Sequence, residues 1–391
     1  NTINNNYMKE RKKVWYAPYK FESYGEAEIK AVEESLRDGW LAGFGPRTTE
    51  FEQKIAKEFG KKYGVFVNSG SSACLLAIAS LDLEKGSEII TPSLTFSTTL
   101  APIIQLGYVP KFIDSELTTY VPSVNAIIEA ITSKTKAIMV PNLIGNKPDW
   151  ELLRRELMRM NRSDIFVIED SADTITSTED SDISTTSFYA SHVITAGGMG
   201  GMVMFNKKEH KKRALMFRDW GRIGDNSENM DDRFTHSVDG LPYDYKFLYG
   251  VLGYNMKCAE ANAAFGLVQL ERFQSFKNIR RANIERYLEN LKDVKELILP
   301  DDSIKPNWLA IPLQTKNRLE LLQFLEKNNI QTRVTFAGNV TRHPVYREYL
   351  QDFEVADTIM KNGFLLGAHH GMNTDDVDYV CDKIKEFYAS K

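Results

Sequence analysis

Five short apolar runs constrain the fold of this chain more than any other feature. They read YGVFVNSG, SEIITPS, VPKFIDS, KAIMVPN and DIFVIEDS. Their β-branched and aromatic residues favour strands, and the segments around them have helical periodicity, as at residues 24–40, 48–60 and 71–83. Strands that alternate with helices form a mostly parallel sheet with helices on its faces. The sequence therefore predicts an α/β fold.

A change of pattern after about residue 290 indicates a second unit. A helical segment at 257–291 is long enough to link two domains. After it, the runs LAIPLQ and IQTRVTF and two further helical segments predict a small α+β domain. We expect an N-terminal arm at residues 1–15, a large domain at 16–275 and a small C-terminal domain at 276–391.

The composition argues against several classes of protein. The 391 residues carry a net charge of -4, so neither a nucleic acid nor a membrane surface is an expected partner. No apolar run reaches the roughly 18 residues of a membrane span, and the polar N-terminus lacks the core of a signal peptide. Cys74, Cys258 and Cys381 lie far apart without a CxxC pair. We therefore expect no disulfide framework, no metal site and a cytoplasmic location.

The stretch VNSGSSACLL joins the end of a predicted strand to the start of a helix. Gly70, Ser71 and Ser72 lie at the helix N-terminus, where free N–H groups and the helix dipole favour a phosphate. The serine hydroxyls would add hydrogen-bond donors. A serine N-cap after a tight turn explains the same residues without a ligand.

Two more motifs follow the ends of predicted strands. In FVIEDSAD, Asp170 ends a buried strand, and ligands of open α/β sheets bind at such ends. Its carboxylate could pair with the protonated ring nitrogen of a cofactor, or Asp170 could cap a helix. In TPSLTFSTT, Phe96 could stack on a flat cofactor or fill the core. The coincidence of three such motifs at strand ends predicts a cofactor site.

Together these motifs resemble those of the nucleotide-sugar aminotransferase and dehydratase family, from about Tyr16 to the C-terminus. Its members are fold-type I pyridoxal-phosphate (PLP) enzymes, related in fold to aspartate aminotransferase. The resemblance implies that Gly70–Ser72 hold the cofactor phosphate, that Phe96 stacks on the ring and that Asp170 meets the ring nitrogen. Asp173 occupies the position near the cofactor hydroxyl, where aminotransferases of the family have Gln or His.

The stretch SFYASHVITAGGMGG departs from the family pattern at one decisive position. The family motif SFYxxK supplies a serine for the cofactor phosphate and a lysine that binds the cofactor covalently. Here the motif gives Ser187 and His192, and no lysine appears before Lys207. The family's GYN motif, which reaches the cofactor phosphate of a neighbouring subunit, is present with Asn255. That motif implies a homodimer with shared active sites.

Histidine in place of the lysine marks a smaller branch of the family, the sugar 3-dehydratases. Histidine can move protons near neutral pH but cannot form a stable imine. We therefore expect pyridoxamine phosphate as the working cofactor and His192 as the acid and base. The expected reaction removes the C3 hydroxyl of a nucleotide-linked 4-keto-6-deoxy sugar, in deoxysugar biosynthesis such as that of lipopolysaccharide O-antigen. An amino donor, L-glutamate by resemblance, would restore the amine.

Two kinds of sugar 3-dehydratase share features with this chain. PNLIGNKPD resembles a loop of the enzymes that act on GDP-4-keto-6-deoxymannose. RDWGR and FAGNVTRHP look more like the enzymes that act on CDP-4-keto-6-deoxyglucose, which carry an iron–sulfur cluster. Such a cluster needs about four thiolates, and this chain has three scattered cysteines, so we expect no cluster.

Substrate contacts are expected from residues outside the cofactor motifs. The candidates are Asn142, Arg222 and Arg342, since arginine suits phosphate groups, although solvated surface positions explain the two arginines equally well. Two other functions stay open. An aminotransferase that works from free pyridoxamine phosphate would make an amino sugar. A non-catalytic relative would bind cofactor or sugar, but the retained cofactor motifs favour chemistry.

Overall fold

The computed structural model describes residues 12–224 and 227–391, so residues 1–11 of the predicted arm lie outside the described residues. Its centre is a seven-stranded sheet. The strands are β1 (Tyr63–Val67), β2 (Glu88–Pro92), β3 (Val109–Ile113), β4 (Thr135–Pro141), β5 (Phe166–Asp170), β6 (Ile183–Ser187) and β7 (Gly201–Phe205). Their order is β1-β7-β6-β5-β4-β2-β3, and only β7 runs antiparallel to its neighbours. The prediction of an α/β fold with a mostly parallel sheet is confirmed.

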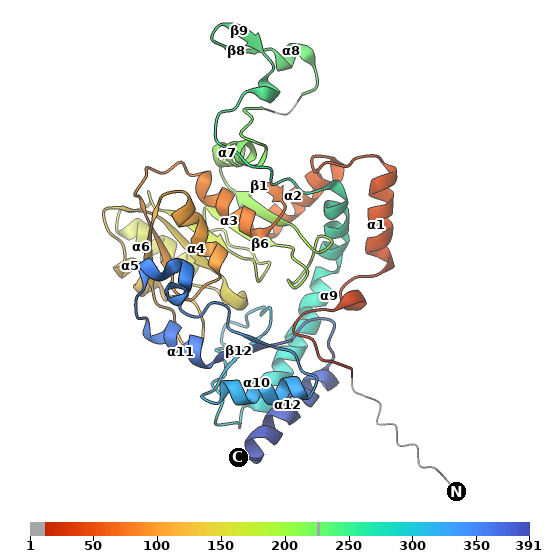
Figure 1. Ribbon diagram of the computed structural model, residues 1–391, viewed down its shortest axis with the longest axis vertical. Coiled ribbons are helices and arrows are strands. Elements are labelled where there is room, and N and C mark those ends of the chain that lie inside the picture. The colour runs from red at the N-terminus through yellow and green to blue at the C-terminus, as the bar shows by residue number, and fades with distance from the viewer. Residues whose placement is uncertain (1–11, 225–226) are drawn as a thin grey trace.

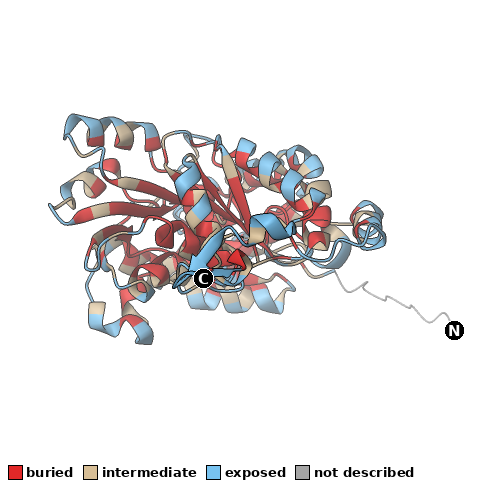
Figure 2. Ribbon diagram, turned by 90° about the horizontal axis from the view of Figure 1, so that it is seen from above, coloured by how far each residue is buried: buried red, intermediate tan, exposed pale blue. Residues whose placement is uncertain are grey.

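Helices cover both faces of this sheet. They are α2 (Pro46–Glu58), α3 (Gly70–Ala79), α4 (Ser97–Gln105), α5 (Val124–Glu129), α6 (Trp150–Arg159) and α7 (Lys208–Arg218). Helix α1 (Glu26–Arg37) packs instead against the long helix at Glu260–Leu291. Successive side chains of a strand point to opposite faces. Val65 and Val67 of β1 therefore pack with α3 and α4 on one face, while Phe66 meets Phe51 of α2 on the other. Figure 2 shows the strands buried between helices whose outer faces are exposed.

A second, antiparallel sheet lies below the first in Figure 1. Its strands, in the order β10-β12-β11, are β10 (Ile311–Gln314), β12 (Gly363–Leu366) and β11 (Thr332–Val334). Its helices are α10 (Arg318–Lys327), α11 (Glu354–Asn362) and α12 (Thr374–Ala389). The long helix α9 (Glu260–Leu291) packs against α1, α2 and α12, and so links the two sheets. Because α9 crosses residue 275 without a break, the predicted domain boundary stays a prediction.

Between α7 and α9 the chain projects from the body as an arm (Figure 1). The arm carries α8 (Met230–Arg233) and a hairpin of β8 (His236–Val238) and β9 (Leu241–Tyr243), and the hairpin residues are all exposed. Arg233 forms an ion pair with Asp244 and so joins the two sides of the arm. The sequence analysis did not predict this arm.

Two properties bear on the predicted compartment and cofactors. In the part of the chain that the structure describes, every helix is too short or too polar to cross a lipid bilayer. The cysteines are free and buried, and each lies in a different hydrophobic cluster. Within residues 12–224 and 227–391, no three His, Cys, Asp or Glu side chains gather as metal ligands would.

Candidate active site

A cavity of about 560 Å³ opens at the carboxyl ends of the parallel strands. Its walls come from the segments that follow β1, β2, β4, β5 and β6, and from Leu309 and residues 333–336 beyond α9. Seven of the predicted cofactor and catalytic residues line it. They are Gly70, Ser71, Phe96, Asp170, Asp173, Ser187 and His192. The motifs that lie far apart in the sequence therefore meet in one site.

One end of the cavity is suited to a phosphate. Gly70 begins α3, and a Cβ atom added at Gly70 would lie 2.7 Å from the Cβ atom of Ser187. Glycine therefore allows the helix N-terminus to approach the end of β6. The Ser71 hydroxyl lies 2.9 Å from that of Thr98. Free helical N–H groups and these hydroxyls form a cradle for an anion.

The serine N-cap that could explain this turn without a ligand also exists, but it uses other atoms. Ser69 is the cap residue, and its Oγ accepts a hydrogen bond from the backbone N–H of Ser72 at 3.0 Å. The hydroxyl of Ser72 donates to Oδ1 of Asn68 at 2.6 Å. Ser72 therefore stabilises the turn and does not line the cavity, whereas Gly70 and Ser71 do.

Asp170 lies at the end of β5 and is buried. Its Oδ2 accepts a hydrogen bond from Thr99 at 2.7 Å, and its Oδ1 accepts from Thr185 at 3.3 Å and from the N–H of Ala172 at 3.2 Å. Burial raises the pKa of Asp170, and these hydrogen bonds oppose that rise. No described lysine or arginine pairs with this carboxyl, so a cationic ring nitrogen suits the position. The sequence analysis missed Thr99, although its hydroxyl-rich motif was a signal.

Phe96 lies at the N-cap of α4 and lines the cavity. Its side chain is 53% exposed, so the alternative that Phe96 fills the core is wrong. It meets Phe336 edge to face at a centroid distance of 6.3 Å. An exposed aromatic face at a cavity wall can stack on a flat cofactor ring.

His192 lies in the loop between β6 and β7, and its imidazole is partly exposed to the cavity. Its Nδ1 lies 3.8 Å from Oδ1 of Asp173. Burial lowers the pKa of His192 to about 4, and burial raises the pKa of Asp173 to about 7. Between those pH values both groups are uncharged, so they form no ion pair there. A neutral imidazole can accept a proton.

The loop after β4 positions Asp173. The N–H of Ile144 donates to Oδ2 of Asp173 at 2.7 Å. Ile144 has φ +64°, a left-handed conformation that a β-branched residue rarely adopts. The N–H of Leu309 donates to the carbonyl of Ile144 at 2.7 Å and helps to hold this conformation. The loop thereby fixes the carboxyl beside His192.

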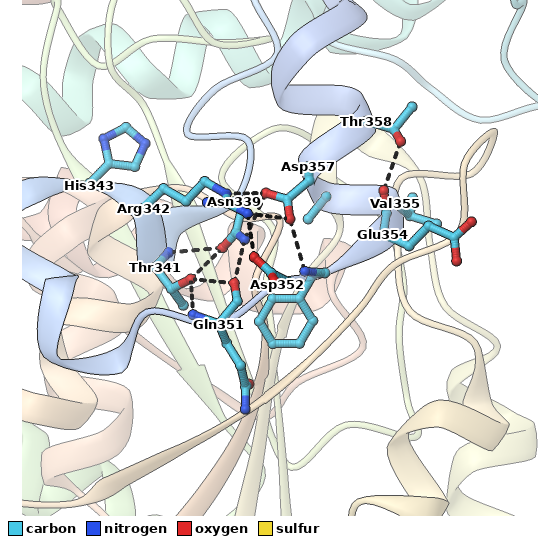
Figure 3. A network of polar contacts seen from close by, with 12 residues as sticks. Asn339, Thr341, Arg342, His343, Gln351, Asp352, Glu354, Val355, Asp357 and Thr358 are labelled. Carbon is cyan, nitrogen blue, oxygen red and sulfur yellow. Dashed lines mark hydrogen bonds and ion pairs between the residues drawn. The ribbon is translucent and has the colours of Figure 1, made fainter.

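Two of the predicted substrate residues have partners within the protein and are not part of the cavity wall. Asn142 is buried and bonds to Ser171, so it contributes to the protein interior. Arg342 forms ion pairs with Asp357 and Asp352, as Figure 3 shows. Neither residue lines the cavity, and a direct contact with substrate stays a prediction for both.

Arg222 and Asn255 lie outside the cofactor cavity. The Arg222 guanidinium stacks on Trp220 at 4.5 Å and lines a separate cavity of about 670 Å³. Asn255 is exposed and pairs through its backbone with Asp219. Since Asn255 does not line the cavity of its own chain, its predicted contact with a cofactor requires a second subunit.

Two lining residues had no signal in the sequence. Tyr16 comes from the segment before α1, and Arg333 comes from β11. Burial raises the pKa of Tyr16, so its hydroxyl stays protonated at neutral pH. Both residues reach the cavity only through the packing of distant segments, so no local motif marks them.

The donor set fits pyridoxal phosphate. A helix N-terminus with serine hydroxyls suits its phosphate, Phe96 suits its ring face and Asp170 suits its ring nitrogen. This fold and site define a fold-type I PLP-dependent enzyme. The chain belongs to the DegT/DnrJ/EryC1/StrS aminotransferase family, whose profile matches residues 22–385.

Relatives of this chain include both dehydratases and aminotransferases of nucleotide sugars. The chain is 36% identical to the lipopolysaccharide biosynthesis protein RfbH of Salmonella typhimurium, over 93% of this chain and 90% of that protein. It is 34% identical to dTDP-4-dehydro-2,6-dideoxy-D-glucose 3-dehydratase of Saccharopolyspora spinosa, over 92% and 84%. A solved GDP-4-keto-6-deoxymannose-3-dehydratase (ColD) variant with bound GDP-perosamine has a TM-score of 0.83 and 27% identity, over 94% and 100%. GDP-perosamine synthase of Escherichia coli is 30% identical, over 96% and 100%.

Proposed function

We propose that this chain is a sugar 3-dehydratase that uses pyridoxamine phosphate. It removes the C3 hydroxyl of a nucleotide-linked 4-keto-6-deoxy sugar, and an α-amino acid such as L-glutamate restores the cofactor amine. The observation that carries the proposal is His192 in the cavity, beside Asp173, with no lysine among the described lining residues.

The protein holds the cofactor by contacts other than a covalent bond. When bound, the cofactor supplies an amino group and an electron-accepting ring. Gly70, Ser71 and Ser187 would hold its phosphate, Phe96 would stack on its ring, and Asp170 would keep the ring nitrogen protonated. Because a carboxylate favours a cationic neighbour, Asp170 also favours electron withdrawal into the ring.

His192 moves the protons of the reaction. Its Nδ1 faces the Asp173 carboxyl, so Nε2 is the atom that takes a proton from carbon and returns it. A lysine amine is longer and would deliver its proton to C4 of the sugar, which gives an amino sugar. The imidazole, which is shorter and lies 3.8 Å from the Asp173 carboxyl, instead returns its proton to the departing C3 hydroxide.

The net reaction balances in atoms and electrons. The sugar loses one oxygen at C3 and gains the two electrons that the amino donor loses. The donor exchanges its amino group for a ketone oxygen, and the nitrogen leaves as ammonia. No external reductant is needed, so the route requires no iron–sulfur cluster.

The proposal includes a homodimer, with Asn255 of each subunit at the cofactor phosphate of the other. The exposure of Asn255, away from its own cavity, supports this arrangement. The proposal also assigns the enzyme to the cytoplasm, because free cysteines persist in a reducing compartment.

Product analysis tests the proposal. The protein is incubated with PLP, L-glutamate and a panel of GDP-, CDP-, dTDP- and UDP-4-keto-6-deoxy sugars, and the products are measured by mass spectrometry. A sugar nucleotide that is lighter by one oxygen supports the 3-dehydratase and identifies its nucleotide. Replacement of the ketone oxygen by an amino group would make the chain an aminotransferase. Cofactor binding without any product would make it a non-catalytic relative.

A further inference from the structure

Two segments that lie far apart in the sequence meet beside Asp173. Residues 142–146 form the loop after β4, and residues 307–309 belong to the connection between α9 and β10. The N–H of Leu309 donates to the carbonyl of Ile144, and the N–H of Ile144 donates to Oδ2 of Asp173. Both distances are 2.7 Å. The position of the Asp173 carboxyl therefore depends on where residues 307–309 lie.

A side-chain hydrogen bond joins the same two segments. The indole Nε1 of Trp308 donates to Oδ1 of Asn146 at 2.8 Å, and both side chains are buried. The Nδ2 atom of Asn146 also donates to the carbonyl of Leu143 at 3.2 Å, so its amide is held within its own loop. Because a buried donor without a partner is costly, this bond fixes one segment against the other.

The backbone at this contact leaves little room for movement. Gly145 has φ +105°, and a Cβ atom added there would lie 2.3 Å from the carbonyl oxygen of Asn307. Only glycine permits this close approach. Ile144 has φ +64°, which a β-branched residue adopts only when its surroundings hold it there. We call the contact between residues 307–309 and residues 144–146 the clasp.

A buried cation anchors the clasp to the long helix. Arg280 of α9 donates from Nη1 to the carbonyl of Leu309 at 2.8 Å and from Nε to Nδ1 of His370 at 3.3 Å. Because α9 packs against helices of both sheets, the clasp is tied to the framework of the protein. Neither Trp308 nor Asn146 lines the cavity, so they can act on the reaction only through residues that do.

We propose that Trp308 and Asn146 are positioning residues, whose hydrogen bond keeps the clasp closed. The closed clasp holds Ile144 in its strained conformation and so holds the Asp173 carboxyl beside His192. When the clasp opens, the loop relaxes, and the carboxyl loses the N–H that fixes it 3.8 Å from the imidazole. This inference rests on the proposed function in taking His192 as the acid and base. It holds whether the sugar loses its C3 hydroxyl or gains an amino group.

The amide proton of Ile144 reports on the clasp without turnover. Because it donates to Asp173, its chemical shift should move downfield as that carboxyl ionises, with a midpoint near the Asp173 pKa of about 7. The shift is followed by NMR in full-length protein labelled with ¹⁵N-isoleucine, and Ile144→Val identifies the signal. The wild type should show this titration. Trp308→Phe, which keeps an aromatic ring but removes the indole N–H, should lose most of it.

The donor half-reaction tests the consequence for catalysis. Trp308→Phe and Asn146→Ala should each lower its maximal rate by about 10-fold and keep KM for L-glutamate within about twofold, because geometry and not binding is lost. The double variant should be no slower than either single variant, since all three lack the same hydrogen bond. The isotope effect of α-deuterated L-glutamate should be larger in the variants than in the wild type, because proton transfer becomes the slow step.

Tyr120→Phe is the matched control. Tyr120 is buried in the same hydrophobic cluster as Trp308, and its hydroxyl accepts a hydrogen bond from Gln314 at 3.1 Å. Neither Tyr120 nor Gln314 belongs to the clasp. The control should lower Tm but leave the donor kinetics and the Ile144 titration unchanged.

The outcomes that would overturn the proposal are distinct from those that would overturn the proposed function. An unchanged rate or a full Ile144 titration in Trp308→Phe would overturn the clasp, and so would an equal loss of rate in Tyr120→Phe. An amino-sugar product from the wild type would refute the dehydratase and leave both measurements on the clasp intact.

Discussion

The carboxyl of Asp173 lies 3.8 Å from the imidazole of His192, and burial shifts the pKa values of the two groups in opposite directions. The pKa of the carboxyl rises to about 7, and that of the imidazole falls to about 4. The histidine therefore stays neutral at physiological pH, while the state of its partner changes there. By its resemblance to the family motif SFYxxK, we expect His192 to occupy the position of the covalent lysine, and Asp173 the position where aminotransferases of the family have Gln or His.

The pair predicts a pH dependence. At 3.8 Å the two groups are just beyond hydrogen-bond distance. At closer approach, ionised Asp173 would accept the Nδ1 proton of His192 and leave Nε2 free as a base, whereas protonated Asp173 would donate to Nδ1 and block that tautomer. The kcat/KM for dehydration should therefore rise as pH increases through about 7. Asp173→Asn should remove this rise and lower kcat/KM by about 10-fold or more. Rate profiles from about pH 5 to 9 measure both effects. If kcat/KM of the variant still rose through about pH 7, the rise would belong to another titrating group.

Replacement of the histidine should separate chemistry from cofactor binding. His192→Asn should lower kcat of the sugar half-reaction by about 10²- to 10⁴-fold, since it removes a general acid and base. The variant should still bind pyridoxamine phosphate, because the phosphate cradle and Asp170 are intact. Stopped-flow absorbance and a cofactor titration measure the two properties.

His343→Asn is the matched control for that experiment. His343 lies 2.7 Å from the carbonyl of Ala337 through Nε2 and does not line the cavity, so its kcat should match the wild type. Full turnover by His192→Asn would show that the imidazole is not the acid and base of the reaction.

Subunit mixing tests whether the active sites are shared. Asn255→Ala and His192→Asn should each be weakly active alone. If Asn255 serves the partner's cofactor, a mixed dimer has one site with both changes and one site with neither. Co-refolded or co-expressed variants should therefore recover activity toward a quarter of the wild-type value in a random mixture, measured per active site. No recovery in a preparation shown to contain mixed dimers would place both residues in the same chain's site.

The ion pair of Arg342 predicts a structural role for that residue. Arg342 lowers the pKa of Asp357 to about 2, so the pair stabilises the folded state above the ordinary carboxyl pKa of 3.8 and loses that effect as pH falls through about 2. Arg342→Gln should lower Tm at pH 7, and the loss should shrink as the pH is lowered. KM for the sugar nucleotide should stay within about twofold. A large rise in KM with unchanged Tm would instead support a contact with substrate.

The sequence predicted those parts of the fold that have strong local patterns. The apolar runs of β1 to β5 and the helical periodicity of α9 correspond to observed elements. Strand β6 was missed because its residues, Ile183–Ser187, are mostly serine and threonine, although all are buried. Their hydroxyls have partners inside the protein, such as Asp170 for Thr185, so burial did not require apolar residues.

Seven of the expected cofactor and catalytic residues line the cavity, and the motifs that mark them lie at or after the ends of strands. Two other lining residues have no such motif. In the sequence, Tyr16 precedes all strands of the large sheet and Arg333 follows them. Only tertiary packing brings these two residues together at the cavity. The strained conformation of Ile144, which fixes Asp173, also has no signature in the residue type itself.

The most direct test of the central claim is the stoichiometry of nitrogen. The protein is supplied with PLP, ¹⁵N-labelled L-glutamate and its preferred 4-keto-6-deoxy sugar nucleotide, and the ammonia, 2-oxoglutarate and sugar products are quantified together. A dehydratase that uses His192 as described gives one ammonia and one 2-oxoglutarate for each 3-deoxy sugar, with no ¹⁵N in the sugar. Retention of ¹⁵N at C4 of the sugar, without free ammonia, would contradict the account and make the chain an aminotransferase.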